Sequence, residues 1–384
     1  MDTLARQCLE TLFVAGEKSD AGVRSRAPAL TARDLRAYSE LRSLQAKESF
    51  DTTMRAAEID GAVTLTWEPL DRTIARVALG RLDALAAFLG KTTTGTTLKS
   101  ARQMLAGMVE RHPVLAEVLE QWRLLRKVRG ISVLGAGRWA DAVRVVDYCR
   151  ARPSSSDEAI RNASAVLFND SKRIEKLSAA LDVLLVGDLE APAREDQQVW
   201  RELGLFREDQ PMAFAGNVTM RRTRVTGLLD APYVGYPADA VLGLESRPDK
   251  ILCIENQTNF REEARKRCGD PELLIFSAGM PSPAWCAALG RLLETTDAGV
   301  PVYHWGDYDQ GGFRIATHIA KEVERHGRKL LPWRMDPTSI PASRRLPASR
   351  KTVLRMRDYA LAAGWQEIAA AIEKHPFTTE QEGL

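Results

Sequence analysis

The sequence predicts a multi-domain α/β protein, α+β overall, with a mostly parallel C-terminal sheet flanked by helices. Beyond about residue 198, short apolar strand-like runs alternate with helical patterns, an order typical of a parallel sheet. Before that point the pattern is mainly helical, apart from one β-rich stretch at residues 62–79. A chain of 384 residues, 45% of them hydrophobic, can form more than one hydrophobic core. We therefore expect three domains, over residues 1–90, 91–190 and 191–384.

The composition predicts a cytoplasmic protein that has no membrane partner. No run of about 18 apolar residues is present, and the first residues lack the segments of a signal peptide. The five cysteines are scattered without a C-x-x-C pair, which favours a reducing compartment and argues against a zinc ribbon. The net charge of +3 does not by itself indicate nucleic-acid binding. Arginines nevertheless cluster locally, and a local cluster is what contacts a phosphate backbone.

The N-terminal domain follows the element order of a winged helix. Helical spacing over residues 31–59 is followed by two strand-like runs, 62–67 and 73–79, that would form a hairpin. The last part of the helical region, about 44–59, would be the recognition helix, and the hairpin would be the wing. Basic residues on both would bind DNA phosphates; the alternative is a small packing domain with ordinary surface arginines. These basic residues are Lys47, Arg55, Arg72 and Arg76.

The C-terminal domain carries the clearest strand pattern. Helices are expected at about 260–268, 283–295 and 312–326, between or after the later strands. The turn after the second strand is basic, with Arg221 and Arg222 as DNA-binding candidates, although a solvated hairpin explains it equally well. The candidate strands are Met212–Phe214, Val218–Met220, Ala240–Leu244, Ile251–Ile254, Leu273–Phe276 and Val300–Trp305.

Three acidic residues follow two of these strands. Asp307 and Asp309 lie between the strand 300–305 and a helical pattern, where open α/β sheets place their chemistry. Glu255 ends the strand Ile251–Ile254, and a carboxylate there is costly without a partner. Because the carboxyl ends of parallel strands share one edge, we expect the three carboxylates to converge and bind Mg²⁺ or Mn²⁺. The alternative is that they are solvated turn residues or helix caps.

This combination resembles a known family. A strand-end glutamate followed by a later strand and D-x-D-x-x-G is similar to the Toprim fold of topoisomerases, primases and certain nucleases. More narrowly, the chain resembles the JetD-type nuclease subunits of Wadjet anti-plasmid systems, which are similar to the A subunit of type VI topoisomerase. The stretches that carry the resemblance are Leu167–Lys172, Ile254–Phe260, Ser277–Ser282, His304–Phe313 and Glu380–Glu382.

The resemblance implies a function and a set of partners. Glu255, Asp307 and Asp309 match the metal-binding acids of the family, which implies a metal-dependent endonuclease that cuts double-stranded circular plasmid DNA. It also implies an SMC-type ATPase, its kleisin and an accessory subunit as partners. The chain departs from the pattern at Asn256, where other Toprim proteins commonly have glycine, and at Asn169, where we also expect glycine.

Further residues near these motifs are weaker candidates. Arg314 and Lys172 are candidate phosphate contacts, and Glu382 is a candidate extra metal ligand if the C-terminal segment folds back. His304 and His318 flank the aspartates and could assist proton transfer, although packing roles explain them more simply.

The cut can be covalent or hydrolytic, and the sequence favours hydrolysis. Tyr38 is the one tyrosine in the expected winged helix, and it lacks the paired arginines that a catalytic tyrosine needs. A homodimer is expected, because two strands must be cut with one site per chain. The alternatives are a topoisomerase-like Toprim adaptor that binds DNA without cleaving it, and a D-x-D metal-dependent nucleotide-processing transferase.

Overall fold

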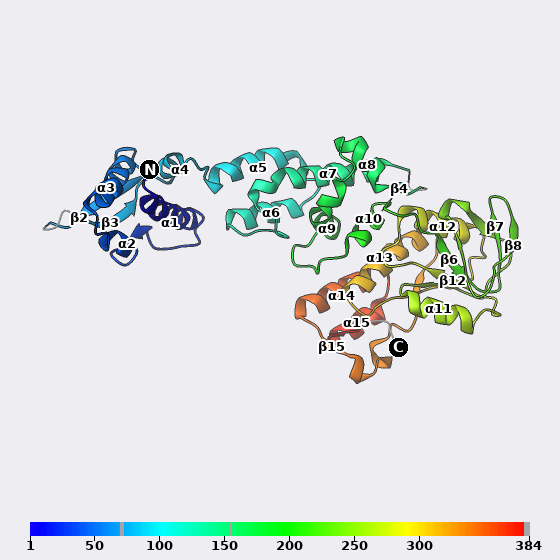
Figure 1. The fold of residues 1–384 in the computed structure, drawn as a ribbon. Helices are drawn as coiled ribbons and strands as arrows, with labels where there is room; N and C mark the ends of the chain where they lie inside the picture. The colour runs from blue at the N-terminus through cyan, green and yellow to red at the C-terminus, as the bar shows by residue number, and fades with distance from the viewer. Residues whose placement is uncertain (70–72, 154–155, 380–384) are drawn as a thin grey trace. The chain divides into compact units, whose positions relative to one another are not determined.

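The computed structural model describes residues 1–69, 73–153 and 156–379. The chain divides into two compact units (Figure 1). The first contains Met1–Arg144 and Ala179–Ala193, and the second contains Val145–Ser178 and Arg194–Leu384. The expected boundaries near residues 90 and 190 stay predictions. Among the described residues, no helix is long and apolar enough to cross a membrane.

The first unit is mainly helical and contains one small antiparallel sheet of order β1-β3-β2. The sheet is built from β1 (Ala29–Leu30), β2 (Val63–Trp67) and β3 (Ile74–Leu79). The helical pattern and the hairpin expected from the sequence are therefore present, while the winged-helix assignment stays a prediction. The helices that lie wholly or partly in this unit are α1 (Thr3–Asp20), α2 (Arg36–Ser39), α3 (Leu44–Ile59), α4 (Leu82–Phe88), α5 (Thr94–Val109), α6 (Val114–Arg123), α7 (Ala136–Ala151) and α9 (Ser178–Val186).

Tyr38 belongs to the core of the first unit. Its side chain is 2% exposed and stacks on Phe50, with 4.4 Å between the ring centroids. Its hydroxyl donates to Asp51 Oδ1 at 2.8 Å and accepts from Ile74 N–H at 3.2 Å. Burial is the main reason that the pKa of Tyr38 rises to about 12. These contacts identify Tyr38 as a packing residue that joins α2 and α3 to β3.

The second unit is built around a mixed six-stranded sheet of order β14-β13-β11-β12-β6-β9. The first four of these strands are parallel, whereas β6 and β9 form an antiparallel edge. The strands are β6 (Met212–Ala215), β9 (Val234–Tyr236), β11 (Ile251–Ile254), β12 (Leu273–Phe276), β13 (Val302–Trp305) and β14 (Leu330–Pro332).

Smaller sheets complete the second unit. An antiparallel sheet has the order β10-β7-β8, from β7 (Thr219–Arg222), β8 (Thr226–Leu228) and β10 (Val241–Leu244). Two short pairs are β4 (Glu158–Ala159) with β5 (Leu205–Phe206), and β15 (Leu346–Pro347) with β16 (Phe377–Thr378). The remaining helices are α8 (Ile160–Phe168), α10 (Asp196–Glu202), α11 (Gln257–Lys266), α12 (Pro283–Glu294), α13 (Gln310–Arg325), α14 (Arg350–Ala362) and α15 (Gln366–Lys374).

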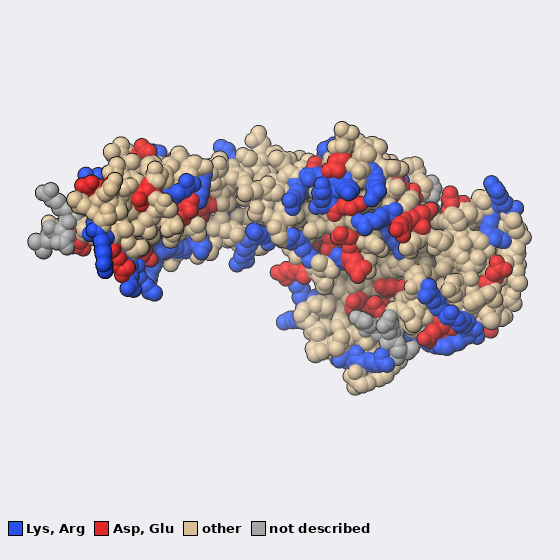
Figure 2. All heavy atoms as spheres, in the orientation of Figure 1, with Lys and Arg blue, Asp and Glu red and all other residues tan. Residues whose placement is uncertain are grey.

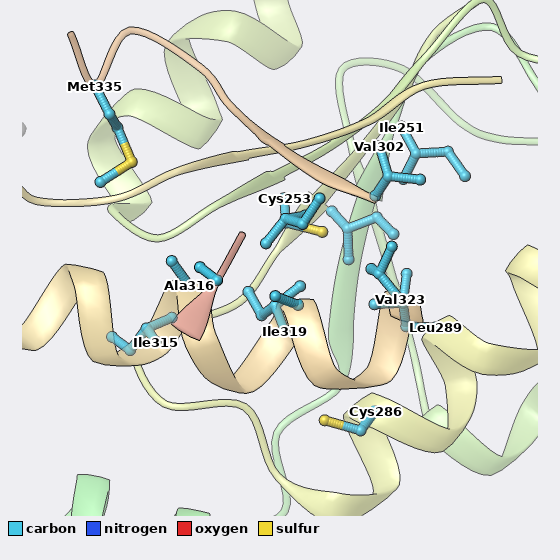
Figure 3. Packing of buried hydrophobic residues seen from close by; sticks show 14 of the residues in the cluster. Ile251, Cys253, Cys286, Leu289, Val302, Ile315, Ala316, Ile319, Val323 and Met335 are labelled. Carbon is cyan, nitrogen blue, oxygen red and sulfur yellow. The ribbon is translucent and has the colours of Figure 1, made fainter. Parts of the chain in front are cut away.

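Helices cover both faces of the central sheet. On one face, apolar residues of β11 and β13 pack against α13 and α12 (Figure 3). On the other face, Leu252, Ile254 and Trp305 form a second cluster with Phe260 of α11. All four residues of β11 are buried, as expected for a central strand of a parallel sheet. This packing fixes the carboxyl ends of β11 and β13 side by side.

We expect Tyr38→Phe to lower the free energy of unfolding of the first unit by about 1–3 kcal/mol, because the buried Ile74 N–H loses its acceptor. Chemical denaturation followed by circular dichroism measures the change. Tyr359→Phe is the matched control, since Tyr359 is half-buried on α14 and lies in the second unit. Equal stability of wild type and Tyr38→Phe would contradict the packing role.

Candidate functional site

Glu255 and Asp307 meet at the carboxyl edge of the central sheet. In the parallel pairing of β11 with β13, Ile254 lies opposite Trp305, so the next residues of both strands leave the sheet together. The Glu255 N–H donates to the Trp305 carbonyl at 3.0 Å. The Asp307 N–H donates to Glu255 Oε2 at 3.2 Å. The structure therefore brings together two acids that are far apart in the sequence.

Two glycines make this approach possible. A Cβ atom on Gly306 would lie 2.6 Å from Glu255 Oε2 and 2.7 Å from His304 Nε2. A Cβ atom on Gly312 would overlap the backbone carbonyl of Asp307. Neither glycine has a left-handed backbone, so the requirement is for space. Gly306 leaves room for the Glu255 carboxylate, and Gly312 lets α13 begin against the Asp307 backbone.

Asp309 caps helix α13. Its Oδ1 accepts the Gly312 N–H at 2.8 Å, and its backbone is extended, as is usual for an N-cap residue. Burial raises the pKa of Asp309, and the backbone N–H groups of Gly312 and Gly311 oppose that rise. In this structure the Asp309 side chain therefore has a structural task in addition to any role as a ligand.

The electrostatics at Glu255 are unfavourable for a carboxylate. Burial and then the charges of Asp307 and Asp309 raise the pKa of Glu255 to about 8, while the Asp307 N–H opposes the rise. A divalent cation would relieve this repulsion, and carboxylate oxygens are ligands that Mg²⁺ prefers. Among the residues that the structure describes, no three His, Cys, Asp or Glu side chains form a ready-made metal site. The donor chemistry thus fits a hard cation, while convergence of all three carboxylates stays a prediction.

Glu255 and Asp307 line a cleft of about 670 Å³ within the second unit. Its wall also contains Asp157, Arg201 and Arg207. Arg201 Nη1 donates to the Ala278 carbonyl at 2.8 Å, in the turn that follows β12. Burial lowers the pKa of Arg201, while the charge of Asp157 opposes that change. The sequence did not predict a role for Arg201, because nothing in its local spacing distinguishes it from other helix arginines.

Arg314 occupies an ion pair in this structure. Its Nη2 donates to Glu202 Oε1 at 2.7 Å, and Arg194 Nη1 donates to Glu202 Oε2 at 2.6 Å. The three side chains are largely buried. The charges of the two arginines keep the pKa of Glu202 below its ordinary value despite the burial. Phosphate contact by Arg314 stays a prediction, and such contact would have to compete with Glu202.

The other DNA-binding candidates in the second unit lie on its surface or against neighbours. Lys172 is exposed in the turn after α8. Arg221 Nη1 lies 3.3 Å from Glu245 Oε1, and the guanidinium of Arg222 lies 4.4 Å from the ring centroid of Tyr236. Figure 2 shows basic and acidic side chains interspersed over the face drawn.

The candidates of the first unit lie on α3 and the hairpin. Lys47 is half-buried, whereas Arg55 and Arg76 are exposed. The Arg55 guanidinium lies 4.8 Å from the ring centroid of Trp67 on the adjacent strand. Arg72 and Glu382, the candidate extra ligand, lie outside the described residues.

His304 is fully buried, whereas His318 is half-buried. Burial lowers the pKa of His304 to about 4 and also lowers the pKa of His318. His304 lies under Gly306, and the nearby charge of Glu202 opposes the shift at His318. Their burial favours packing roles over proton transfer to a substrate.

Comparison with known proteins supports the expected resemblance. A family model described as "Protein of unknown function C-terminus (DUF2399)" matches residues 241–384. The Wadjet protein JetD of Bacillus cereus (strain Q1) is 29% identical over 172 residues, which cover 42% of this chain and 41% of JetD. The match thus spans about two fifths of the length of that protein. The expected resemblance is confirmed, and the chain is JetD-like over the matched region.

We expect Glu255→Gln to stabilise the metal-free protein at high pH. The pKa of Glu255 is about 8 in the folded state and near its usual 4.5 when unfolded. The folded state therefore holds a proton that the unfolded state has released, so this group's contribution to stability falls as the pH rises from about 4.5 to 8. Melting in EDTA at pH 5.5 and pH 8.5 should show a smaller loss of stability for Glu255→Gln, by roughly 3 °C or more.

The same pair of proteins tests metal binding. Adding Mg²⁺ at pH 8.5 should raise the melting temperature of the wild type, because a ligand that binds only the folded state stabilises it. Glu255→Gln should show little of this rise. Parallel pH profiles for the two proteins in EDTA, together with equal responses to Mg²⁺, would exclude the proposed electrostatics of the site.

Proposed function

We propose that this chain is a metal-dependent endonuclease that cuts double-stranded DNA, acting as the nuclease component of a Wadjet-type anti-plasmid system. The observation that carries the proposal is the contact between Glu255 and Asp307 at the carboxyl ends of two neighbouring parallel strands. Asp309 comes directly after Tyr308, which is buried. Glu255 and Asp307, which follow the two strand ends, line a cleft. The JetD-like sequence of the matched region supports the same assignment.

Glu255, Asp307 and Asp309 would hold Mg²⁺ or Mn²⁺. Such an ion, when bound, polarises a phosphodiester and lowers the pKa of a bound water, which is the chemistry that hydrolysis needs. Glu255 would have to release the proton that its raised pKa retains, and Asp309 would have to share its carboxylate with the Gly312 N–H. The release of the Glu255 proton makes metal binding stronger at higher pH.

Arg201 is the cationic side chain that we assign to the DNA phosphate in this cleft. It lines the cleft together with Glu255 and Asp307. Among the described residues, the Ala278 carbonyl is the one acceptor for its guanidinium, so further N–H groups can donate to a phosphate. Arginine suits this task because its planar fork matches two phosphate oxygens.

The proposal favours hydrolysis over a phosphotyrosine link. Tyr38 is buried and bonded within the first unit, and Tyr308, between the two aspartates, is 1% exposed. Burial raises the pKa of both phenols, which disfavours the phenolate that a nucleophile needs.

The partners are part of the same proposal. An SMC-type ATPase with its kleisin and an accessory subunit would bring DNA to this chain, and a homodimer would supply one site for each strand. The resemblance to the JetD type supports these partners. The sequence itself contains no G-x-x-x-x-G-K-[ST] nucleotide-binding loop, so the ATPase is proposed as a separate subunit.

The test is cleavage of supercoiled plasmid in Mg²⁺ or Mn²⁺ with the SMC-type partner complex present. We expect linear product from the wild type and a loss of at least about 100-fold in rate for Asp307→Asn, which removes the charge of a ligand while keeping its shape. Asp358→Asn is the matched control, since Asp358 is exposed on α14 and pairs with Arg357. It should cut like the wild type.

Other outcomes would point to the alternatives. Protein covalently joined to the cut ends would support a topoisomerase-like reaction. DNA binding without cutting, in the wild type and in Asp307→Asn alike, would support an adaptor. Equal cutting by the wild type and Asp307→Asn would remove the acidic site from the mechanism.

A further inference from the structure

The loop that carries the two aspartates is paired with a distant part of the chain. Tyr308, between Asp307 and Asp309, forms an isolated antiparallel bridge with Thr379. The Tyr308 N–H donates to the Thr379 carbonyl at 2.9 Å, and the Thr379 N–H donates to the Tyr308 carbonyl at 3.0 Å. This reciprocal exchange of two hydrogen bonds is the pairing unit of an antiparallel sheet.

Side-chain packing strengthens the same contact. Tyr308 stacks on Phe377 with 5.0 Å between ring centroids, and it meets Phe313 of α13 edge-on at 5.3 Å. Phe377 is 6% exposed and Thr379 is 4% exposed. The 377–379 segment thus covers the buried side of the aspartate loop with both backbone and side-chain contacts.

The segment is itself anchored in the fold. Phe377 and Thr378 form β16, which pairs with β15 through Leu346 and Pro347. The guanidinium of Arg345 lies 4.6 Å from the ring centroid of Phe377 and donates to the Ile340 carbonyl. The contact with Tyr308 is therefore made by an element that has its own support.

The pairing with Thr379 also affects the directions of the side chains next to Tyr308. Successive side chains of a paired segment point to opposite sides. Tyr308 is 1% exposed, whereas Asp307 and Asp309 on either side of it are both half-buried, as this alternation predicts. Glu255 lies close to this loop, because the Asp307 N–H donates to Glu255 Oε2 and the charges of both aspartates act on the Glu255 carboxyl. The pairing with Thr379 therefore sets the direction of both aspartates at once.

We propose that the 377–379 segment is a positioning element of the acidic site, which holds Asp307 and Asp309 on the side of Glu255 through the Tyr308–Thr379 backbone pair. The inference rests on the proposed function, because it assumes that these acids bind a divalent metal. The segment touches no substrate; it fixes the loop on which the ligands lie. Loss of the pairing leaves all three carboxylates in the chain and weakens their common binding of a metal.

The test compares Thr379→Pro with Thr379→Ala in the full chain. Proline removes the N–H that donates to the Tyr308 carbonyl, whereas alanine keeps it. Mn²⁺ alone is the probe, and its dissociation constant is measured by electron paramagnetic resonance. We expect Thr379→Pro to weaken Mn²⁺ binding at least about 10-fold. Thr379→Ala should stay within about twofold of the wild type.

A second variant and a folding measurement complete the test. Circular dichroism and melting show whether each variant is folded, and Phe377→Leu keeps an apolar side chain while removing the ring that stacks on Tyr308. A folded Phe377→Leu protein should bind Mn²⁺ about threefold more weakly. Plasmid cleavage should recover at higher metal concentration in both variants, which a general loss of structure would not allow.

The outcomes separate this inference from the proposed function. If the wild type binds Mn²⁺ and folded Thr379→Pro binds it equally well, the positioning role is wrong and the nuclease proposal stands. If Thr379→Pro does not fold and Phe377→Leu binds like the wild type, the positioning role is again wrong. If the wild type binds no Mn²⁺, the proposed metal site fails, and the positioning role fails with it.

Discussion

Repulsion among Glu255, Asp307 and Asp309 is the constraint on which the rest of the second unit depends. Partly buried carboxylates at one sheet edge oppose folding unless they are protonated or share a cation. Burial and the two neighbouring charges raise the pKa of Glu255 well above that of an ordinary glutamate. The fold has to hold Glu255 and Asp307 in contact against this repulsion, which requires rigid supporting elements.

The supports come from three directions. The parallel pair of β11 and β13 fixes the backbones on both sides of the Glu255–Asp307 contact. Asp309 is the N-cap of helix α13, and this cap fixes the end of the loop. The pairing of Tyr308 with Thr379 closes the buried side. A binding site placed on rigid elements in this way can be partly organised before any ligand arrives, and burial on both faces of the sheet supplies that rigidity.

Much of the C-terminal architecture could be predicted from local pattern. Strands Ile251–Ile254 and Leu273–Phe276 have the predicted bounds, because each is a short, unbroken apolar run buried within a sheet. Helix α13 begins at Gln310, earlier than predicted, because Asp309 provides the cap. The expected parallel character holds for part of the sheet only. Strands β6 and β9 add an antiparallel edge, and β7, β8 and β10 form a separate antiparallel sheet, since strand partners across long connections leave no local trace in the sequence.

By itself, the sequence determined which chemistry is available: carboxylates at the ends of two apolar strands, with glycines beside them and a helical pattern after them. Periodicity and residue type suffice for that conclusion, because strand ends and caps are local features. Only the tertiary structure decided which groups meet. It pairs Arg314 with Glu202, places Arg201 in the cleft and joins Tyr308 to Thr379. Such contacts join residues far apart in the chain, and they follow from the packing of the whole unit rather than from any spacing along the sequence.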